Sequence, residues 1–348
     1  MSGQAYRIIL VCGLLGSFFC AAAAMGGETR FSTTGISRGR AIAMGGAYHS
    51  VVDDFSAMWY NPSALRVNKT REERNLRLFF NPLGMAVGLA DYARFDRDMV
   101  RDDELTPGEG ALALLSLFRG AVYTTPMVDF GLSLGEEMLS ADPARVETHR
   151  FFSAREQSLG SMYAASANVK IASTVSIGLS GALYYSRVNG EAVTGSGYTF
   201  GVLLNPNRRL NVGIAYHDLA DEMPEARFPM ETIADGTVVG GISYYPDEDI
   251  TFSIDLRNLN KDDKRSSREI HAGLERVFGN RVALRAGYFR KNETDNDVLS
   301  VGFGLLPFWD RISRYRNSAR SDILTYTWII DKNGERSDWH LFSLMLRY

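Results

Sequence analysis

Apolar and polar residues alternate with a period of two along most of the chain after about residue 73. Residues 250–257 read ITFSIDLR, and residues 175–183 (VSIGLSGAL) and 282–289 (VALRAGYF) follow the same rule. Successive side chains of a strand point to opposite faces, so each segment predicts a strand with one apolar and one small or polar face. In a soluble sandwich the apolar face would meet a second sheet, whereas in a transmembrane barrel it faces lipid.

The lengths of the connections favour the barrel. Short, turn-forming connections are predicted at Asn81–Pro82, Thr125–Pro126, Ala172–Ser173, Asn205–Pro206–Asn207, Pro246–Asp247–Glu248 and Gly279–Asn280. They alternate with long polar connections at residues 94–117, 139–155, 218–234 and 260–267. Short periplasmic turns and long extracellular loops alternate in this way in outer-membrane barrels. We therefore predict an all-β, antiparallel transmembrane barrel over residues 73–348, with about fourteen strands and sixteen as the alternative.

The first 24 residues have the layout of a secretory signal peptide. Arg7 precedes an apolar stretch from Ile8 to Phe19, and a run of four alanines supplies a cleavage pattern. Both cysteines, Cys12 and Cys20, lie in this segment. Cleavage would leave a mature chain without a thiol, which excludes disulfides, cysteine metal sites and cysteine catalysis. The predicted destination is the outer membrane of a double-membraned bacterium, which the chain reaches by export through this cleaved signal peptide.

The last ten residues, WHLFSLMLRY, predict a closing amphipathic strand. Phe342, Leu344, Leu346 and Tyr348 fall on one face, with His340 on the same side. Terminal residues of soluble domains usually fray, so an alternating strand that ends on an aromatic residue is typical of an outer-membrane barrel. We expect this strand to be the assembly signal that the barrel-insertion machinery reads.

Residues 25–72 lack strand alternation and are predicted to form a compact, partly helical plug. The segment is rich in Gly, Ala, Asn and Asp, and its apolar residues are too few for an independent core. The lumen of the barrel is the nearest place in which they can be buried.

Within that segment, residues 39–65 read GRAIAMGGAYHSVVDDFSAMWYNPSAL. This motif resembles the amino-terminal hatch of the long-chain fatty-acid transporter (FadL-like) family and of related PorV-like barrels. The matching residues are Gly39, Arg40, Ala41, Gly45, Gly46, Ala47, Asp53, Asp54, Asn61 and Pro62; Ser63 stands where family members commonly have Ala. The resemblance implies a hatch that gates the lumen, in which the Asn61–Pro62 element helps the hatch to move.

The same residues also have a purely structural interpretation. Gly45 and Gly46 permit a tight or positive-φ passage, and Asp53 and Asp54 can cap backbone amides at a helix start. Asn61–Pro62 favours a turn that ends helical structure. Folding of the plug alone would therefore explain the motif as well as gating does.

Charged residues on the predicted strands should face the lumen, because a charge facing lipid costs several kcal/mol near the midplane. They are Asp255, Arg257, His271, Glu275 and Arg285. We expect them to pair with one another or with the plug rather than to contact a substrate.

Competing chemistries have little support. The formal charge of −3 indicates neither a nucleic-acid surface nor an acidic tail. Residues 131–135 (GLSLG) match a hydrolase elbow but lie within an alternating strand, and the five histidines share no ligand spacing. We expect no enzyme, no catalytic residue, no metal and no cofactor.

The predicted function is passive uptake of a fatty-acid-like or lipid-like small molecule through a hatch-gated lumen. Candidate lining residues are Met58, Trp59, Phe118, Phe151, Phe152, Phe228 and Met230. The alternative is a PorV-like barrel that serves secretion or surface attachment of proteins. Expected partners are outer-membrane lipid, lipopolysaccharide, the hydrophobic ligand and the barrel-assembly machinery, with secreted proteins under the alternative.

Overall fold

The computed structural model describes residues 28–32, 38–52, 55–65, 75–82, 117–139, 158–188, 191–219, 236–260, 268–279, 281–291, 296–306, 323–331 and 337–347. The boundaries predicted for the signal peptide and the plug, near residues 24 and 72, lie outside these ranges and stay predictions.

The described chain is almost entirely strand. The strands are β1 (Glu28–Ser32), β2 (Asn75–Phe80), β3 (Phe118–Thr124), β4 (Val128–Leu139), β5 (Ser158–Ala172), β6 (Val175–Val188), β7 (Glu191–Asn207), β8 (Leu210–Leu219), β9 (Thr237–Tyr244), β10 (Ile250–Arg257), β11 (Glu269–Phe278), β12 (Val282–Lys291), β13 (Asn296–Leu305), β14 (Leu324–Asp331), β15 (Ser337–Leu344) and β16 (Leu346–Arg347). Three short helices, α2 (Gly39–Ala43), α3 (Ala57–Tyr60) and the 3-10 helix η1 (Pro62–Ala64), complete the described elements.

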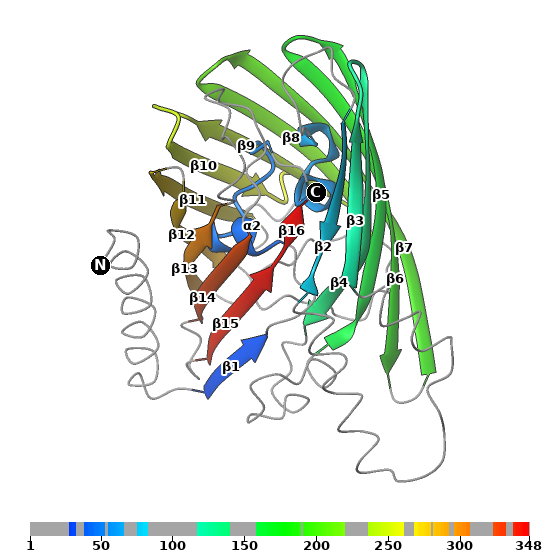
Figure 1. Ribbon diagram of the computed structural model, residues 1–348, viewed down its shortest axis with the longest axis vertical. Helices are drawn as coiled ribbons and strands as arrows, with labels where there is room; N and C mark the ends of the chain where they lie inside the picture. The colour runs from blue at the N-terminus through cyan, green and yellow to red at the C-terminus, as the bar shows by residue number, and fades with distance from the viewer. Residues whose placement is uncertain are drawn as a thin grey trace, which may run out of the picture.

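The strands form one sheet in which β2 to β15 are consecutive antiparallel neighbours. β16 continues β15 after the single residue Met345 and pairs with β2, where Leu346 lies opposite Phe80. The last strand thus has β14 on one side and β2 on the other, which brings the two ends of the sheet together (Figure 1). β1 lies parallel to the first part of β15. The predicted antiparallel barrel of 14 to 16 strands is confirmed.

The burial pattern of the strands is the reverse of that in a soluble protein. On β10 the exposed residues are apolar, with Phe252 45% and Ile254 55% exposed, whereas Thr251, Ser253 and Asp255 are buried. Exposed leucine, isoleucine and aromatic side chains recur on strands around the sheet. On β10 and the other strands with exposed apolar residues, the apolar face points away from the barrel interior and the small or polar face points into it, as expected of a barrel surrounded by lipid. Val298, Ile329 and Leu341 are exceptions, because they are buried in a cluster with Ile42.

The interior holds residues 38–52 and 55–65, which are all buried. We call these described residues the inner segment. Helix α2 packs against β12, β13, β14 and β15, and η1 packs against β5, β6 and β7, so the segment crosses the lumen (Figure 1). It is too short to bury its apolar side chains by itself, and the barrel wall covers them.

Two predicted connections differ from the structure. Asn81–Pro82 is not a tight turn, because β2 pairs directly with β3 and the connection covers residues 81–117. The amide of Asn81 donates to the carbonyl of Leu117 at 2.7 Å, which extends the pairing instead of reversing the chain. Pro206 lies inside β7, because a register shift between Leu204 and Asn207 accommodates a residue without an amide proton.

Candidate functional site

The contact between the inner segment and the barrel wall contains a buried ion triad. Arg40 in α2 donates from Nε and Nη2 to the two carboxylate oxygens of Glu275 on β11, both at 2.8 Å. Arg285 lies opposite Glu275 in the strand register and donates from Nε to the same carboxylate at 2.7 Å. One acid is thus shared by two guanidinium groups, and a bidentate contact of this kind fixes both position and orientation.

A second anchor lies at Asp255 on β10. Its Oδ2 accepts the amides of Tyr48 at 2.7 Å and His49 at 3.0 Å, and His49 Nδ1 lies 2.7 Å from the same oxygen. Three donors from two consecutive residues of the inner segment therefore converge on one carboxylate oxygen. This arrangement pins the chain to β10 at that point.

His49 continues this anchor across the lumen. Its Nε2 lies 3.0 Å from Nε2 of His217 on β8, and His217 Nδ1 lies 3.0 Å from the hydroxyl of Thr199 on β7. An ionised carboxylate only accepts hydrogen bonds, so His49 Nδ1 donates to Asp255. With both imidazoles neutral, His49 Nε2 accepts from His217 Nε2, and His217 Nδ1 accepts from the Thr199 hydroxyl. The result is a directional chain of hydrogen bonds from β7 through the inner segment to β10.

The glycine pair of the motif forms the next contact with the wall. Gly45 and Gly46 have φ of 65° and 71°, the left-handed region predicted from the sequence. The carbonyl of Gly45 lies 2.6 Å from Nδ1 of His271, and that of Gly46 accepts from Arg257 Nη2 at 2.8 Å. His271 also stacks on Phe289, with ring centroids 4.6 Å apart.

Asn61 and Pro62 join α3 to η1. The Asn61 side chain caps η1 by accepting the Ser63 amide at 3.1 Å, and its Nδ2 donates to the His49 carbonyl at 2.7 Å. Pro62 occupies the first turn of η1, where a missing amide proton has no consequence. Asn61 thereby links the two halves of the inner segment, and Ser63 in turn donates its hydroxyl to Asn61 Oδ1.

Glycines on the inner face of the wall make room for the inner segment. A Cβ added at any of them would overlap an atom of the inner segment. They are Gly178 on β6, Gly201 on β7, Gly213 on β8, Gly273 on β11, Gly287 on β12 and Gly302 on β13. Contacts this close are possible only where the wall residue has no side chain.

Ser50 is held by uncharged groups at the turn-proximal end of β8 and β9. Its carbonyl accepts from Ser243 Oγ at 2.9 Å and from Asn211 Nδ2 at 3.2 Å. Both groups also lie 3.2 Å from the Tyr245 hydroxyl. Burial raises the pKa of Tyr245, so its phenol stays protonated within this network.

Toward β5 and β6 the inner segment packs through apolar and aromatic side chains. Tyr48, Trp59 and Tyr60 form one cluster with Met162 and Tyr184. Further residues of the segment, including Phe55 and Met58, pack with Phe79 on β2, Val122 on β3 and Leu203 on β7. The ion pairs described above join the segment to β10 and β11, so its charged anchors and this aromatic cluster lie on different parts of the wall.

The other predicted residues are placed as follows. Gly39 lies at the start of α2, and its carbonyl accepts from Thr327 Oγ1 at 3.0 Å. Phe342, Leu344 and Leu346 are half-buried on β15 and β16. Asp53, Asp54, Tyr348, Phe151, Phe152, Phe228 and Met230 lie outside the described residues.

Sequence reasoning missed His49, His217 and Thr199 as one group. The two histidines are 168 positions apart and share no spacing that indicates a contact. The available signal was that His217 falls on the polar face of its strand, where an inward position was predictable. Ser133 of the elbow-like GLSLG sequence is buried within β4, so no strand-to-helix turn exposes it.

Two kinds of feature are absent from the described residues. None of the helices among them has the length and apolar character needed to cross a membrane. No group of three or more His, Cys, Asp or Glu side chains within those residues has an arrangement that could hold a metal ion.

The fold and the inner segment define the class: an antiparallel β-barrel whose lumen holds an amino-terminal segment. The chain is similar in structure to the CymD monoaromatic hydrocarbon channel, with 11% identity, a TM-score of 0.44 and coverage of 88% of this chain and 94% of that one. It is also similar to the toluene transporter TbuX of Ralstonia pickettii, with 13% identity, a TM-score of 0.45 and coverage of 90% and 97%. A porin of Rh. blastica matches more distantly, with 11% identity, a TM-score of 0.34 and coverage of 66% and 77%.

No protein-family model matches the sequence, and no curated protein matches it. Similarities of this size concern the fold alone and say nothing about what this chain binds.

Proposed function

We propose that the chain is an outer-membrane barrel that admits hydrophobic small molecules through its lumen when the inner segment shifts. The outward apolar faces support the membrane location, because a closed barrel satisfies its backbone hydrogen bonds within lipid. The predicted signal peptide supports export, and the closing strand supports insertion from the periplasm by the barrel-assembly machinery.

One observation carries the proposal: the inner segment fills the lumen, with charged anchors on β10 and β11 and an aromatic cluster against β5 and β6. An open aqueous pore would leave that space to water, so a solute needs the segment to move. If the inner segment separates from β5 and β6, it uncovers Trp59, Met162 and Tyr184. Such a surface favours an apolar solute over an ion. Separation of the inner segment from β10 or β11 would instead break contacts of buried charged groups, which costs free energy.

Uptake of the fluorescent apolar probe N-phenylnaphthylamine by cells tests this function. Cells that express the wild-type barrel should take up the probe faster than cells without it, while the purified barrel in planar bilayers should show little ion conductance. Replacing Asn61 and Pro62 together by Ala removes the cap of η1 and its fixed φ but leaves every strand intact. Barrel abundance should stay near normal and probe uptake should change severalfold.

Two further variants locate the path. Met162→Ala leaves a space in the aromatic cluster beside β5. Ile329→Ala removes a buried side chain on β14 that packs with Ile42 of α2, the part of the inner segment that the Arg40–Glu275 ion pair holds in place. Uptake should change in the first variant and stay near wild type in the second. Should uptake be unchanged in Asn61→Ala/Pro62→Ala and in Met162→Ala, while the barrel captures a secreted protein through its surface, the transport proposal is replaced by the PorV-like alternative.

A further inference from the structure

The turn between β7 and β8 carries two consecutive arginines at the edge of the lipid-facing surface. Asn207 Oδ1 accepts the amide of Arg209 at 2.7 Å, which closes the turn and leaves Arg208 and Arg209 exposed. Their guanidinium groups make no ion pair with any residue that the structure describes. Among the described residues, these two positive charges at the end of a strand pair therefore have no acidic partner.

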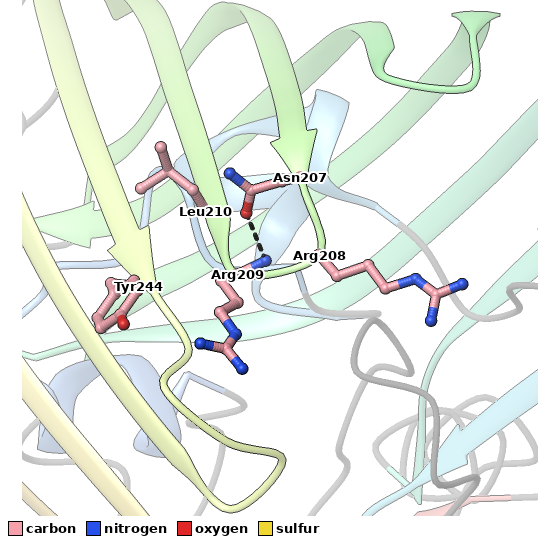
Figure 2. A pocket seen from close by; sticks show the side chains of 5 residues that line it. All are labelled: Asn207, Arg208, Arg209, Leu210 and Tyr244. Carbon is pink, nitrogen blue, oxygen red and sulfur yellow. Dashed lines mark hydrogen bonds between the residues drawn. The ribbon is translucent and has the colours of Figure 1, made fainter.

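Beside this turn lies an open pocket of about 570 Å³, lined by Asn207, Arg208, Arg209, Leu210 and Tyr244. Figure 2 shows Arg209 extending beside Tyr244, while Arg208 extends to the other side of the turn. Leu210 and Tyr244 lie opposite each other on β8 and β9, and they continue the outward apolar face. The next residue in that register is Phe252 on β10, which is 45% exposed. The pocket thus has an apolar floor and a basic rim.

The location of the pocket decides what can fill it. The short turns at residues 173–174 and 208–209 lie at the end of the barrel opposite the connections of residues 140–157 and 220–236, and the connection of residues 306–323 between β13 and β14 lies at the same end as the short turns. In outer-membrane barrels this end faces the periplasm, and aromatic residues mark the depth of the lipid headgroups. The molecules present at that depth are glycerophospholipids, which combine acyl chains with a phosphate. Arginine is well suited to bind phosphate through paired hydrogen bonds.

The neighbouring β9–β10 turn is acidic, and its charge bears on which lipid headgroup fits beside the arginines. The amide of Tyr245 donates to the carbonyl of Arg209 at 2.9 Å, so the β9–β10 turn is fixed beside the arginines. That turn carries Asp247, Glu248 and Asp249 in succession. Asp247 Oδ1 accepts the amides of Asp249 at 2.8 Å and Ile250 at 2.9 Å, so an acid closes the turn and the turn as a whole is negatively charged. A basic group next to an acidic group matches a headgroup that carries a phosphate and an ammonium, and it disfavours a headgroup with an anionic phosphate alone.

We infer that this pocket binds one phosphatidylethanolamine molecule of the periplasmic leaflet. Arg209, which extends beside Tyr244, holds the phosphate, and Arg208 adds positive charge at the rim. The negative charge of the β9–β10 turn attracts the ammonium, and Leu210 and Tyr244 contact an acyl chain. The inference rests on the membrane location proposed above and is independent of gating by the inner segment.

Native mass spectrometry of the full mature barrel, purified in detergent and titrated with phosphatidylethanolamine, tests the inference. The wild type should retain one lipid, and Arg208→Gln/Arg209→Gln should lower retention by roughly tenfold through loss of charge-assisted hydrogen bonds. The matched control Arg276→Gln/Arg281→Gln removes the same charge near the end of β11 and in the β11–β12 turn, and it should retain lipid as the wild type does. Heat-modifiable gel mobility verifies that each variant is folded. If the double variant does not fold, lipid retention is measured on the single variant Arg209→Gln.

Four results would overturn the inference. They are equal retention in the arginine variants and the wild type, an equal loss in the control, displacement of the lipid by millimolar inorganic phosphate, and retention of phosphatidylglycerol as strong as that of phosphatidylethanolamine. Probe uptake separates this site from the transport proposal: Arg208→Gln/Arg209→Gln should lose lipid with normal uptake, and Asn61→Ala/Pro62→Ala should keep the lipid with altered uptake.

Discussion

Arg40 of the inner segment binds Glu275 of β11 through both carboxylate oxygens, at 2.8 Å each, across 235 positions of sequence. Arg285 on β12 holds the same carboxylate from the wall side. The segment is therefore attached to the barrel by an acid that the wall itself orients. Movement of the segment at this point would separate buried charges, so we expect α2 to remain attached while other parts of the segment move.

Glu275→Gln should loosen α2 from the wall. The substitution keeps the shape of the side chain but leaves Arg40 and Arg285 buried without their shared negative charge, a loss of about 3–5 kcal/mol. Trypsin cleavage after Arg38 or Arg40 in the folded barrel measures the loosening, and it should accelerate strongly. Glu248→Gln, at an exposed position in the β9–β10 turn, is the control and should be cleaved as slowly as the wild type. Equal protection of Arg40 in both variants would contradict the anchoring role.

Asp255→Asn should release residues 48 and 49. The carboxylate oxygen accepts two amides and the His49 imidazole, and hydrogen bonds to a charged group contribute about 1.5–3 kcal/mol each. Hydrogen exchange of the Tyr48 and His49 amides should become faster in this variant. Thr199→Val removes only the far end of the hydrogen-bond chain, so its effect on the same amides should be smaller. A larger effect of Thr199→Val would show that the carboxylate is not the main anchor of these two amides.

Gly178→Ala and Gly181→Ala form a matched pair on β6. A Cβ at residue 178 would overlap the backbone of Ser63 and Pro62, whereas a Cβ at residue 181 would meet nothing within 4 Å. Gly178→Ala should destabilise the seating of η1 by about 1–3 kcal/mol, and Gly181→Ala should stay within about 0.5 kcal/mol of the wild type. Hydrogen exchange of the Ala64 and Leu65 amides, followed as urea is raised, compares the two variants. Identical curves would show that the inner segment does not press against this wall.

The sequence predicted the barrel because its pattern repeats locally. Strands such as β10 and β12 present apolar residues at every second position, and they have the faces that ITFSIDLR and VALRAGYF predict. The error at Asn81–Pro82 has a local cause: the dipeptide is a strong turn signal, but β2 and β3 pair on either side of a long connection.

The contacts of the inner segment were less predictable. The inward direction of Glu275 and Arg285 followed from the alternation, but their partner Arg40 did not, because no local rule relates residue 40 to residue 275. The contact between His49 and His217 was unpredictable for the same reason. The need for glycine at residue 178 likewise becomes evident only when Ser63 is seen to lie against it. Such contacts depend on how the segment is seated in the finished barrel, which single-sequence periodicity does not describe.

The closing strand supports a last prediction, on assembly. β15 pairs with β14 up to Leu344 opposite Leu324, and the pairing with β2 is made by Leu346 and Arg347 after Met345. Removing residues 345–348 would leave every other strand pair intact but would take away the described pairing that joins the two ends of the sheet. The truncated chain should therefore fail to give a heat-modifiable outer-membrane band, because an open sheet leaves unpaired backbone groups in lipid.

Tyr348→Asp, which keeps Leu346 and Arg347, should insert at a reduced level, and Arg347→Gln should insert normally. Outer-membrane fractionation of the three variants makes the comparison. Normal insertion of the truncated chain would mean that the barrel closes by another route than the β16–β2 contact, whereas equal insertion of Tyr348→Asp and the wild type would remove Tyr348 from the assembly signal and leave the signal to Phe342, Leu344 and Leu346.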